Sequence, residues 1–264
     1  MGLRSDGTTQ CIPIRGWTPS EEWAKIYTMS DTENQIEAAR HLLRGRFHAI
    51  LSTASARYEG HPFGSLTPYC LESRENPLLL LSHLSEHTRN LDADPRCAFT
   101  LMEEHEGDIQ QAPRLTGQAA AYPLPAEEQP AAARRYFRYY PAARPYYEQL
   151  GFRFYRLEPL RFYFVGGFGA ARWFGTDRIL RPVDDSYEDA AQAVIQELED
   201  ETPWLTRLAS ALKHPAGKPA AIAGLDRDGI DIRLGDRLHR LWLDLPDPTR
   251  RAVMKAVSAR LKLA

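Results

Sequence analysis

A run of leucines near the first third of the chain gives the clearest hydrophobic pattern. Leu78–Leu81 are four consecutive leucines, preceded by Asn76-Pro77 and followed by polar residues from Ser82 onward. Neighbouring side chains of a strand point to opposite faces, so four leucines in a row require cover on both faces. We therefore predict a short strand that is buried on both sides.

Other hydrophobic positions predict a helix followed by many short strands. Ile36, Ala39, Leu42 and Leu43 recur at helical spacing, which predicts an amphipathic helix capped by Asp31 or Thr32. Downstream, short alternating stretches are separated by turn residues, as in hairpins, and this favours an antiparallel barrel or sandwich. We expect strands at 47–54, 61–70, 96–103 and 114–122, helices at 87–93 and 126–150 (broken near Pro141), and a long strand pair kinked at Pro159 over 152–167.

The composition changes around 181–186, where RPVDDS is typical of a linker. Beyond it we expect a helical region interrupted at Pro203, three short strands with glycine-bearing turns, and a terminal helix over 248–263. This pattern predicts a small α+β domain at 185–264. At the other end, residues 1–28 have no periodic pattern and Met29 resembles a protein start, so we expect 1–28 to be a poorly ordered extension.

Composition and charge are those of an ordinary globular protein. The 264 residues are 43% hydrophobic and 26% charged, with a formal net charge of −2. This balance does not favour nucleic-acid or membrane-surface partners, and no apolar run approaches the ~20 residues of a membrane helix. Three widely spaced cysteines favour a reducing compartment over a disulfide framework, so we expect a cytoplasmic protein.

Side chains suited to an anion follow the leucine strand directly. Hydroxyls, imidazoles, an amide and a guanidinium are concentrated where a helix is expected to begin, and such groups bind phosphate or carboxylate. An ordinary solvated helix start explains the same composition equally well, because Thr and Asn often cap helices. The candidates are Ser82, His87, Thr88, Arg89 and Asn90.

Two glycine-bearing segments are candidates for contact with a flat ring. Gly64 and Ser65 would let a ring approach the strand backbone closely, although a β-bulge at Gly64 is the simpler explanation. The run Gly166–Gly169 lacks the helix and the acidic residue of a dinucleotide-binding unit. It could instead cover a ring, with Trp173 stacking and Arg172 offered to an anion; a bulged strand corner is the structural alternative.

Three further patterns do not favour a metal site, a nucleic-acid site or a nucleophilic centre. His83 and His87 have no evident third ligand nearby, so we expect no metal site. The basic, aromatic run 134–147 resembles single-stranded nucleic-acid binders, but its helical spacing favours a packed amphipathic helix. No nucleophile elbow or Cys–His signature is present, and we therefore name no catalytic residue.

Taken together, these motifs resemble a known family. The strand with Pro62-Phe63-Gly64-Ser65, the run LLLLS-x-L-x-x-HTRNL-x-x-DPR, and the later GGFG-x-A-x-W are similar to the FMN-binding split-barrel superfamily, which is pyridoxamine-5'-phosphate-oxidase-like. The closer resemblance is to its haem-utilisation (HugZ-type) branch. It covers residues 33–180, and 185–264 is similar to the small α/β domain that follows the barrel in many members. The resemblance implies an antiparallel split β-barrel followed by that domain.

The resemblance also implies a homodimer with the ligand in the crevice between subunits. It places Ser65 and Thr67 beside the ring, and assigns the phosphate or propionates to the cluster at the helix start. The partner chain would supply its glycine loop. Carried over in full, the cofactor-binding residues are Ser65, Thr67, Ser82, His87, Thr88, Arg89, Asn90, Phe168, Arg172 and Trp173.

For the cofactor, the resemblance leaves FMN and haem as alternatives. Haem-binding relatives carry histidines in their second domain, whereas residues 193–204 contain none and no histidine follows His239. This difference favours FMN and a flavin-dependent oxidoreductase acting on a small-molecule substrate. A haem-binding or haem-degrading protein of iron utilisation is the alternative, and a non-enzymatic carrier of flavin or haem is the third interpretation.

Overall fold

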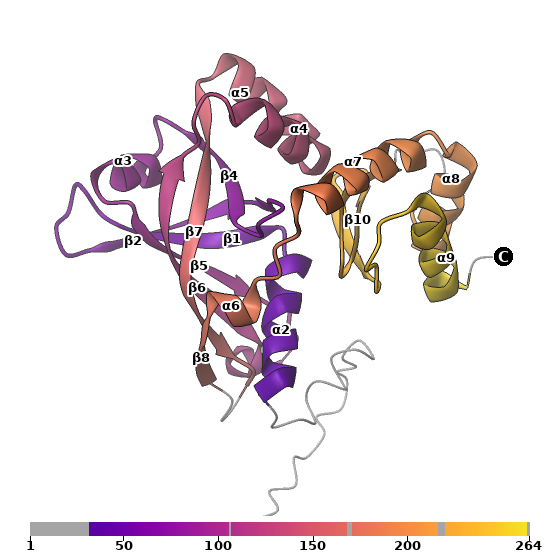
Figure 1. The fold of residues 1–264 in the computed structure, drawn as a ribbon. Coiled ribbons are helices and arrows are strands. Elements are labelled where there is room, and N and C mark those ends of the chain that lie inside the picture. Colours follow the sequence, from indigo (N-terminus) through magenta and orange to yellow (C-terminus); the bar gives the residue numbers. More distant parts are fainter. Residues whose placement is uncertain (1–31, 106, 168–170, 216–219, 263–264) are drawn as a thin grey trace, which may run out of the picture.

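The computed structural model describes residues 32–105, 107–167, 171–215 and 220–262. The expectations for residues 1–28 and for Phe168 therefore lie outside the described residues. Within these ranges the chain forms two antiparallel sheets, an eight-stranded curled sheet and a three-stranded sheet, each with its own helices (Figure 1). The antiparallel split-barrel architecture, followed by a smaller α+β part, is confirmed.

The strands of the large sheet follow the order β2-β1-β5-β6-β7-β4-β3, and β8 pairs with β7. Neighbouring strands are antiparallel throughout, as hairpin-linked strands of this length should be. The strands are β1 (His48–Ala54), β2 (Pro62–Pro68), β3 (Cys70–Leu71), β4 (Pro77–Ser82), β5 (Arg96–Met102), β6 (Arg114–Pro123), β7 (Phe152–Val165) and β8 (Ala171–Gly175).

Helices cover the large sheet at its ends and on one side. The amphipathic helix predicted near Thr32 is confirmed as α2, and its hydrophobic positions are buried in the barrel core. The helical region before β7 is broken at Pro141, as expected. The helical elements are α2 (Thr32–Gly45), α3 (Glu86–Ala93), η1 (Ile109–Gln111), α4 (Gln129–Tyr139), η2 (Pro141–Ala143), α5 (Arg144–Gln149) and α6 (Thr176–Ile179).

The leucine strand is covered on both faces, as predicted. Leu79 and Leu81 belong to the barrel core with α2, whereas Leu78 and Leu80 pack in a second core against α4. Since all four side chains are buried, β4 separates two hydrophobic layers.

One expectation for the large sheet was wrong. Residues 152–167 do not form a strand pair: β7 is a single 14-residue strand. The kink expected at Pro159 corresponds to a bulge in the pairing with β6, where Gln118 pairs with Arg161 and Ala119 pairs with Pro159, leaving Leu160 without a cross-strand partner. A bulge bends a strand without ending it, which the sequence pattern did not distinguish from a turn.

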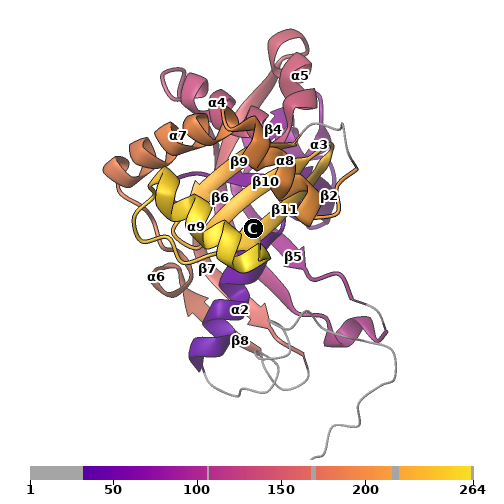
Figure 2. The ribbon, with the colours of Figure 1, turned by 90° about the vertical axis from the view of Figure 1, so that its right-hand side faces the viewer.

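The smaller sheet follows α7 and α8 and has the order β11-β10-β9. Its helices cover one face of the sheet in a separate hydrophobic core. The other face lies against the barrel beside α2 and α4, on the side away from α3 (Figures 1 and 2). Its elements are α7 (Asp185–Glu199), α8 (Thr202–Ala211), β9 (Ala220–Asp226), β10 (Gly229–Leu234), β11 (Arg237–Trp242) and α9 (Arg250–Leu261).

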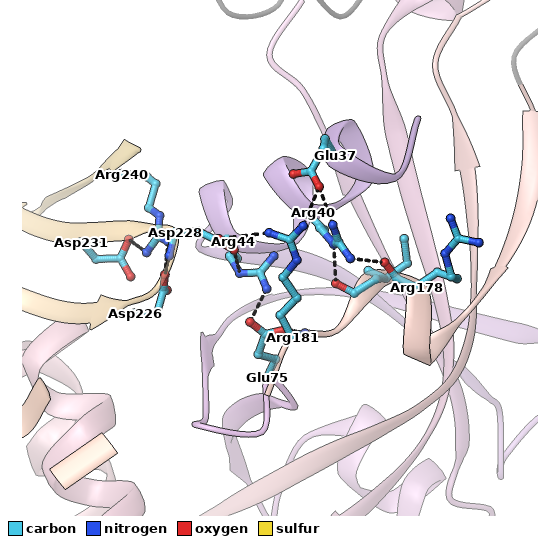
Figure 3. Close-up of polar contacts among 11 residues, drawn as sticks. Glu37, Arg40, Arg44, Glu75, Arg178, Arg181, Asp226, Asp228, Asp231 and Arg240 are labelled. Carbon is cyan, nitrogen blue, oxygen red and sulfur yellow. Dashed lines mark hydrogen bonds and ion pairs between the residues drawn. The ribbon is translucent and has the colours of Figure 1, made fainter. Parts of the chain in front are cut away.

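Buried charges join the two sheets (Figure 3). Arg44 of α2 pairs with Glu75 and lies 3.3 Å from Asp228 of the β9–β10 turn. On the small sheet, Arg240 pairs with both Asp226 and Asp231. Removing one partner of such a buried pair leaves an uncompensated charge, so the Arg44–Asp228 contact favours the observed placement of the small sheet on the barrel.

Tyr139 of α4 completes the contact between barrel and small sheet. Its hydroxyl donates to Asp231 Oδ2 at 2.7 Å. The ring reaches this carboxylate by passing over Gly224 of β9, where a Cβ atom would lie 1.9 Å from Tyr139 Oη. Gly224 is therefore required for close approach rather than for an unusual backbone angle.

Candidate functional site

The predicted anion-binding cluster forms one connected group at the start of α3. Ser85 Oγ donates to the Ser82 carbonyl at 2.7 Å and lies 2.9 Å from Thr88 Oγ1. Ser82 Oγ accepts the Leu84 N–H at 3.2 Å. Ser82 and Thr88 thus lie together at the start of α3, and their hydroxyls organise the turn between β4 and α3.

His87 connects this turn to the neighbouring strand. Its Nδ1 lies 3.1 Å from Ser65 Oγ of β2, so two residues predicted from separate motifs are in contact. Burial lowers the pKa of His87, and the imidazole is accordingly neutral near pH 7. Its Nε2 is buried and has no hydrogen-bond partner among the described residues.

Asn90 and Thr67 face inward and are bonded within the chain. The Asn90 side chain accepts the Ala56 N–H at 2.8 Å and donates to Thr53 Oγ1 at 2.9 Å, and it is fully buried. Thr67 Oγ1 donates to the Ala49 carbonyl at 3.4 Å. In the single chain both side chains therefore contribute to holding α3 and β2 in position.

Arg89 is the exposed cation of the cluster. Its guanidinium lies 3.4 Å from Glu86 Oε2 on the same helix. Because the side chain is 59% exposed, this pair contributes little to stability and leaves most of the fork free for a ligand.

Arg172 and Trp173 of β8 are not brought to the α3 cluster within one chain. Figures 1 and 2 both place β8 and α3 at opposite ends of the barrel. As consecutive strand residues, the two side chains project to opposite faces. Arg172 donates to Thr32 Oγ1 at the start of α2, whereas Trp173 lies across from Tyr163 on the face opposite the core.

The outward face of the large sheet lies opposite the core that contains Leu51, Phe99 and Phe162. It carries residues that were not predicted from the sequence. Arg161 lies over the Trp173 ring, and its partner Gln118 stands directly across from it on β6. The alternation along 114–122 and 161–165 indicates two faces, but pairing between distant strands was needed to bring these side chains together. One continuous row crosses six strands: Leu66, Ile50, Thr100, Thr116, Tyr163 and Trp173.

A polar cavity lies at the junction of barrel and small sheet. Arg44, Tyr69, Cys70, Asp231 and Arg240 are among its lining residues. Burial raises the pKa of the Cys70 thiol to about 12, so it is protonated and a poor nucleophile. The charged groups here are paired, and two of the ion pairs, Arg44–Asp228 and Arg135–Glu188, cross the junction, so the cavity is part of the structural contact.

Two features of other protein classes are not found among the described residues. No group of three or more His, Cys, Asp or Glu side chains is arranged to hold a metal ion within the part of the chain that the structure describes. None of the helices among those residues has both the length and the apolar character needed to cross a membrane.

Comparison with known proteins supports the fold and identifies the family. The curled antiparallel sheet with α2 and α3 defines a split-barrel fold, as the motifs implied. Residues 30–184 match the family model described as "CREG, beta-barrel", which is more than half of the chain. The chain belongs to the CREG β-barrel family.

Relatives extend the comparison beyond the family. The chain is 31% identical over 137 residues to the non-canonical heme oxygenase HOZ, chloroplastic, of Arabidopsis thaliana, covering 52% of this chain and 41% of that protein. It therefore spans about two fifths of that relative's length.

Two solved structures are similar over most of the chain. Atu2129 of Agrobacterium tumefaciens str. C58, described as of unknown function, has a TM-score of 0.68 at 26% identity, covering 89% of this chain and 96% of that one. A heme binding protein from Mycobacterium smegmatis has a TM-score of 0.51 at 25% identity, covering 87% and 98%.

Proposed function

We propose that this chain binds haem at the start of α3. The observation that supports this most directly is the unpartnered Nε2 of His87. In the tautomer in which the Ser65 hydroxyl donates to Nδ1, the neutral imidazole carries its proton on Nε2 and donates to an anionic oxygen. A buried donor without an acceptor costs about 1–3 kcal/mol, which an incoming carboxylate would recover. The residues present therefore fit a ligand with propionate groups.

Two relatives favour haem over other anionic ligands. The plant relative is named a heme oxygenase and the mycobacterial structure a heme binding protein, at 31% and 25% identity. The missing histidines of the second domain had favoured FMN. A ligand site at the start of α3 does not depend on those histidines for its anion contacts, so haem becomes the first candidate ligand. The corresponding function is haem breakdown or haem carriage.

A second copy of this chain is the partner that the proposal requires. The outward face has exposed apolar side chains, including Leu66 at 70%, Ile50 at 50% and Trp173 at 47% exposure. Apolar side chains gathered on one sheet face are typical of an interface. A homodimer through this face would let residues of β8 in one copy approach the α3 cluster of the other.

Haem titration followed at the Soret band tests the proposal. We expect saturable binding by the wild-type chain and about tenfold or greater weakening in His87→Leu, because a buried donor to a charged group is lost. His83→Gln is the matched control, since His83 is exposed four positions earlier on the same turn. No Soret change in the wild type, or equal effects of the two substitutions, would contradict the proposed site.

FMN is the second candidate, and the start of α3 favours it. The first turn of this eight-residue helix has no side-chain cap on its backbone N–H groups, and free N–H groups at a helix start are suited to one phosphate. In this case the chain is an FMN-dependent oxidoreductase of a small-molecule substrate. The visible spectrum of the purified protein separates the two: flavin bands that resist haem addition would replace the first candidate by the second.

A further inference from the structure

Trp173 is held between two neighbours on the outward face. The ring centroids of Tyr163 and Trp173 are 4.9 Å apart, and the two residues are directly paired across β7 and β8. On the same indole, the Arg161 guanidinium carbon lies 4.4 Å from the ring centroid. Both contacts on Trp173 thus come from its own chain. The Arg161 guanidinium over the ring is therefore the group available to a ligand.

Arg161 is held in a fixed orientation by a second contact. Its Nε donates to Gln118 Oε1 at 2.7 Å. With Nε engaged and one face stacked, the two Nη groups remain as a planar fork directed away from these contacts.

The charge of Arg161 is not compensated by an acid. No carboxylate lies within ion-pair distance of it in the described ranges, in contrast to Arg44, Arg156 and Arg240, which each pair with acids. Arg161 is also exposed. An exposed, oriented guanidinium without an acid partner is suited to bidentate binding of a carboxylate.

Arg172, which the resemblance assigned to this role, is directed elsewhere. Its guanidinium donates to Thr32 Oγ1 on the opposite side of β8 from Trp173. The alternation of side chains along β8 therefore places Arg172 and Trp173 on opposite faces of the strand. The cation beside Trp173 is instead Arg161 of β7.

We propose that Arg161 binds a propionate carboxylate of the haem, with Gln118 and Trp173 as positioning residues. This inference rests on the proposed function and adds a second anion site to the one at α3. Haem carries two carboxylates, so a ligand held at α3 of one copy by one carboxylate has a second available for Arg161 of the other copy.

Haem and its dimethyl ester, in which both carboxylates are blocked, test this assignment. We expect Arg161→Gln to weaken haem binding about tenfold or more, the usual effect of losing a charged hydrogen bond, and to leave ester binding unchanged. Gln118→Leu should give a smaller loss with the same selectivity. Arg207→Gln, an exposed arginine of α8, is the matched control and should alter neither ligand's affinity.

Each outcome decides the assignment. Equal weakening of haem and ester by Arg161→Gln, or no weakening of haem, would overturn the role of Arg161 while leaving the proposed function standing. Absence of haem binding by the wild-type chain would refute the proposed function and this inference with it. Thermal unfolding of the ligand-free variants confirms that the exposed substitution leaves the fold intact.

Discussion

Gly224→Ala tests whether the contact between barrel and small sheet is as close as the structure shows. The added Cβ would lie 1.9 Å from Tyr139 Oη, 2.9 Å from Tyr139 Cζ and 3.1 Å from Asp231 Oδ2. Ordinary contacts begin near 3.4 Å, so the tyrosine ring must move. Tyr139 and Asp231 are 6% and 5% exposed, and neither has solvent to move into.

Three contributions set the magnitude. Overpacking a filled interior costs about 1–3 kcal/mol, and losing the Tyr139–Asp231 hydrogen bond to a charged acceptor costs about 1.5–3 kcal/mol. Replacing glycine also restricts the unfolded chain, which returns about 0.4–1 kcal/mol. We expect a net loss of about 2–4 kcal/mol in the free energy of unfolding, or roughly 5–15 °C in Tm for a chain of this size.

Urea and thermal unfolding measure the loss, and a double-mutant cycle assigns it. Tyr139→Phe removes the atom that the new methyl group would meet first, so Gly224→Ala should cost less in the Tyr139→Phe background than in the wild type. Gly64→Ala is the matched strand control, because its Cβ would meet only Ile50 Cγ2 at 3.8 Å. If Gly224→Ala were as mild as Gly64→Ala, or if the two sites were additive, the reasoning about close approach would be refuted.

Two further predictions concern the buried charges of the junction. Burial raises the pKa of Asp231, so its folded-state pKa exceeds the ordinary 3.8 and its charge opposes folding near neutral pH. The contribution of Asp231 to the free energy of unfolding should increase as the pH falls toward its folded pKa. Asp231→Asn should remove this pH dependence, measured by urea unfolding at pH 7 and pH 5. A steeper pH dependence in the variant would contradict the assignment. Arg44→Met removes the cation between Glu75 and Asp228 and should cost about 3–5 kcal/mol at pH 7. Because burial raises the pKa of Glu75, which then protonates more readily, this loss should shrink at pH 5; a loss that is the same at both pH values would show that Glu75 is not the stranded charge.

Local elements followed from local patterns. The helical spacing of Ile36, Ala39, Leu42 and Leu43 predicted α2, and the leucine run predicted a strand buried on both faces. Both signals are short-range, because the positions that a helix or a strand buries repeat every few residues along the chain. The long strand β7 was misread for the same reason: a bulge at Leu160 interrupts the local period, and only pairing with β6 shows that the strand continues.

The candidate site was predictable in composition and only partly in arrangement. The motifs predicted Ser65 and His87 as candidate site residues. The structure joins their side chains by a hydrogen bond across 22 positions of sequence. Thr67 and Asn90 share those motifs, but their hydrogen bonds face the interior. Residue type indicates what a side chain is able to bind, while the face it occupies depends on the register of the sheet.

By itself, the sequence determined the periodicities, and with them the helices, most strands and the turn that precedes α3. It also determined the motif residues through which the split-barrel resemblance was found. The tertiary structure alone decided which side chains meet: Tyr139 with Asp231 over Gly224, Arg44 with Glu75, and Arg161 with Trp173. The physical reason is that periodicity is set within a few residues, whereas these contacts depend on strand register and on the packing of distant segments.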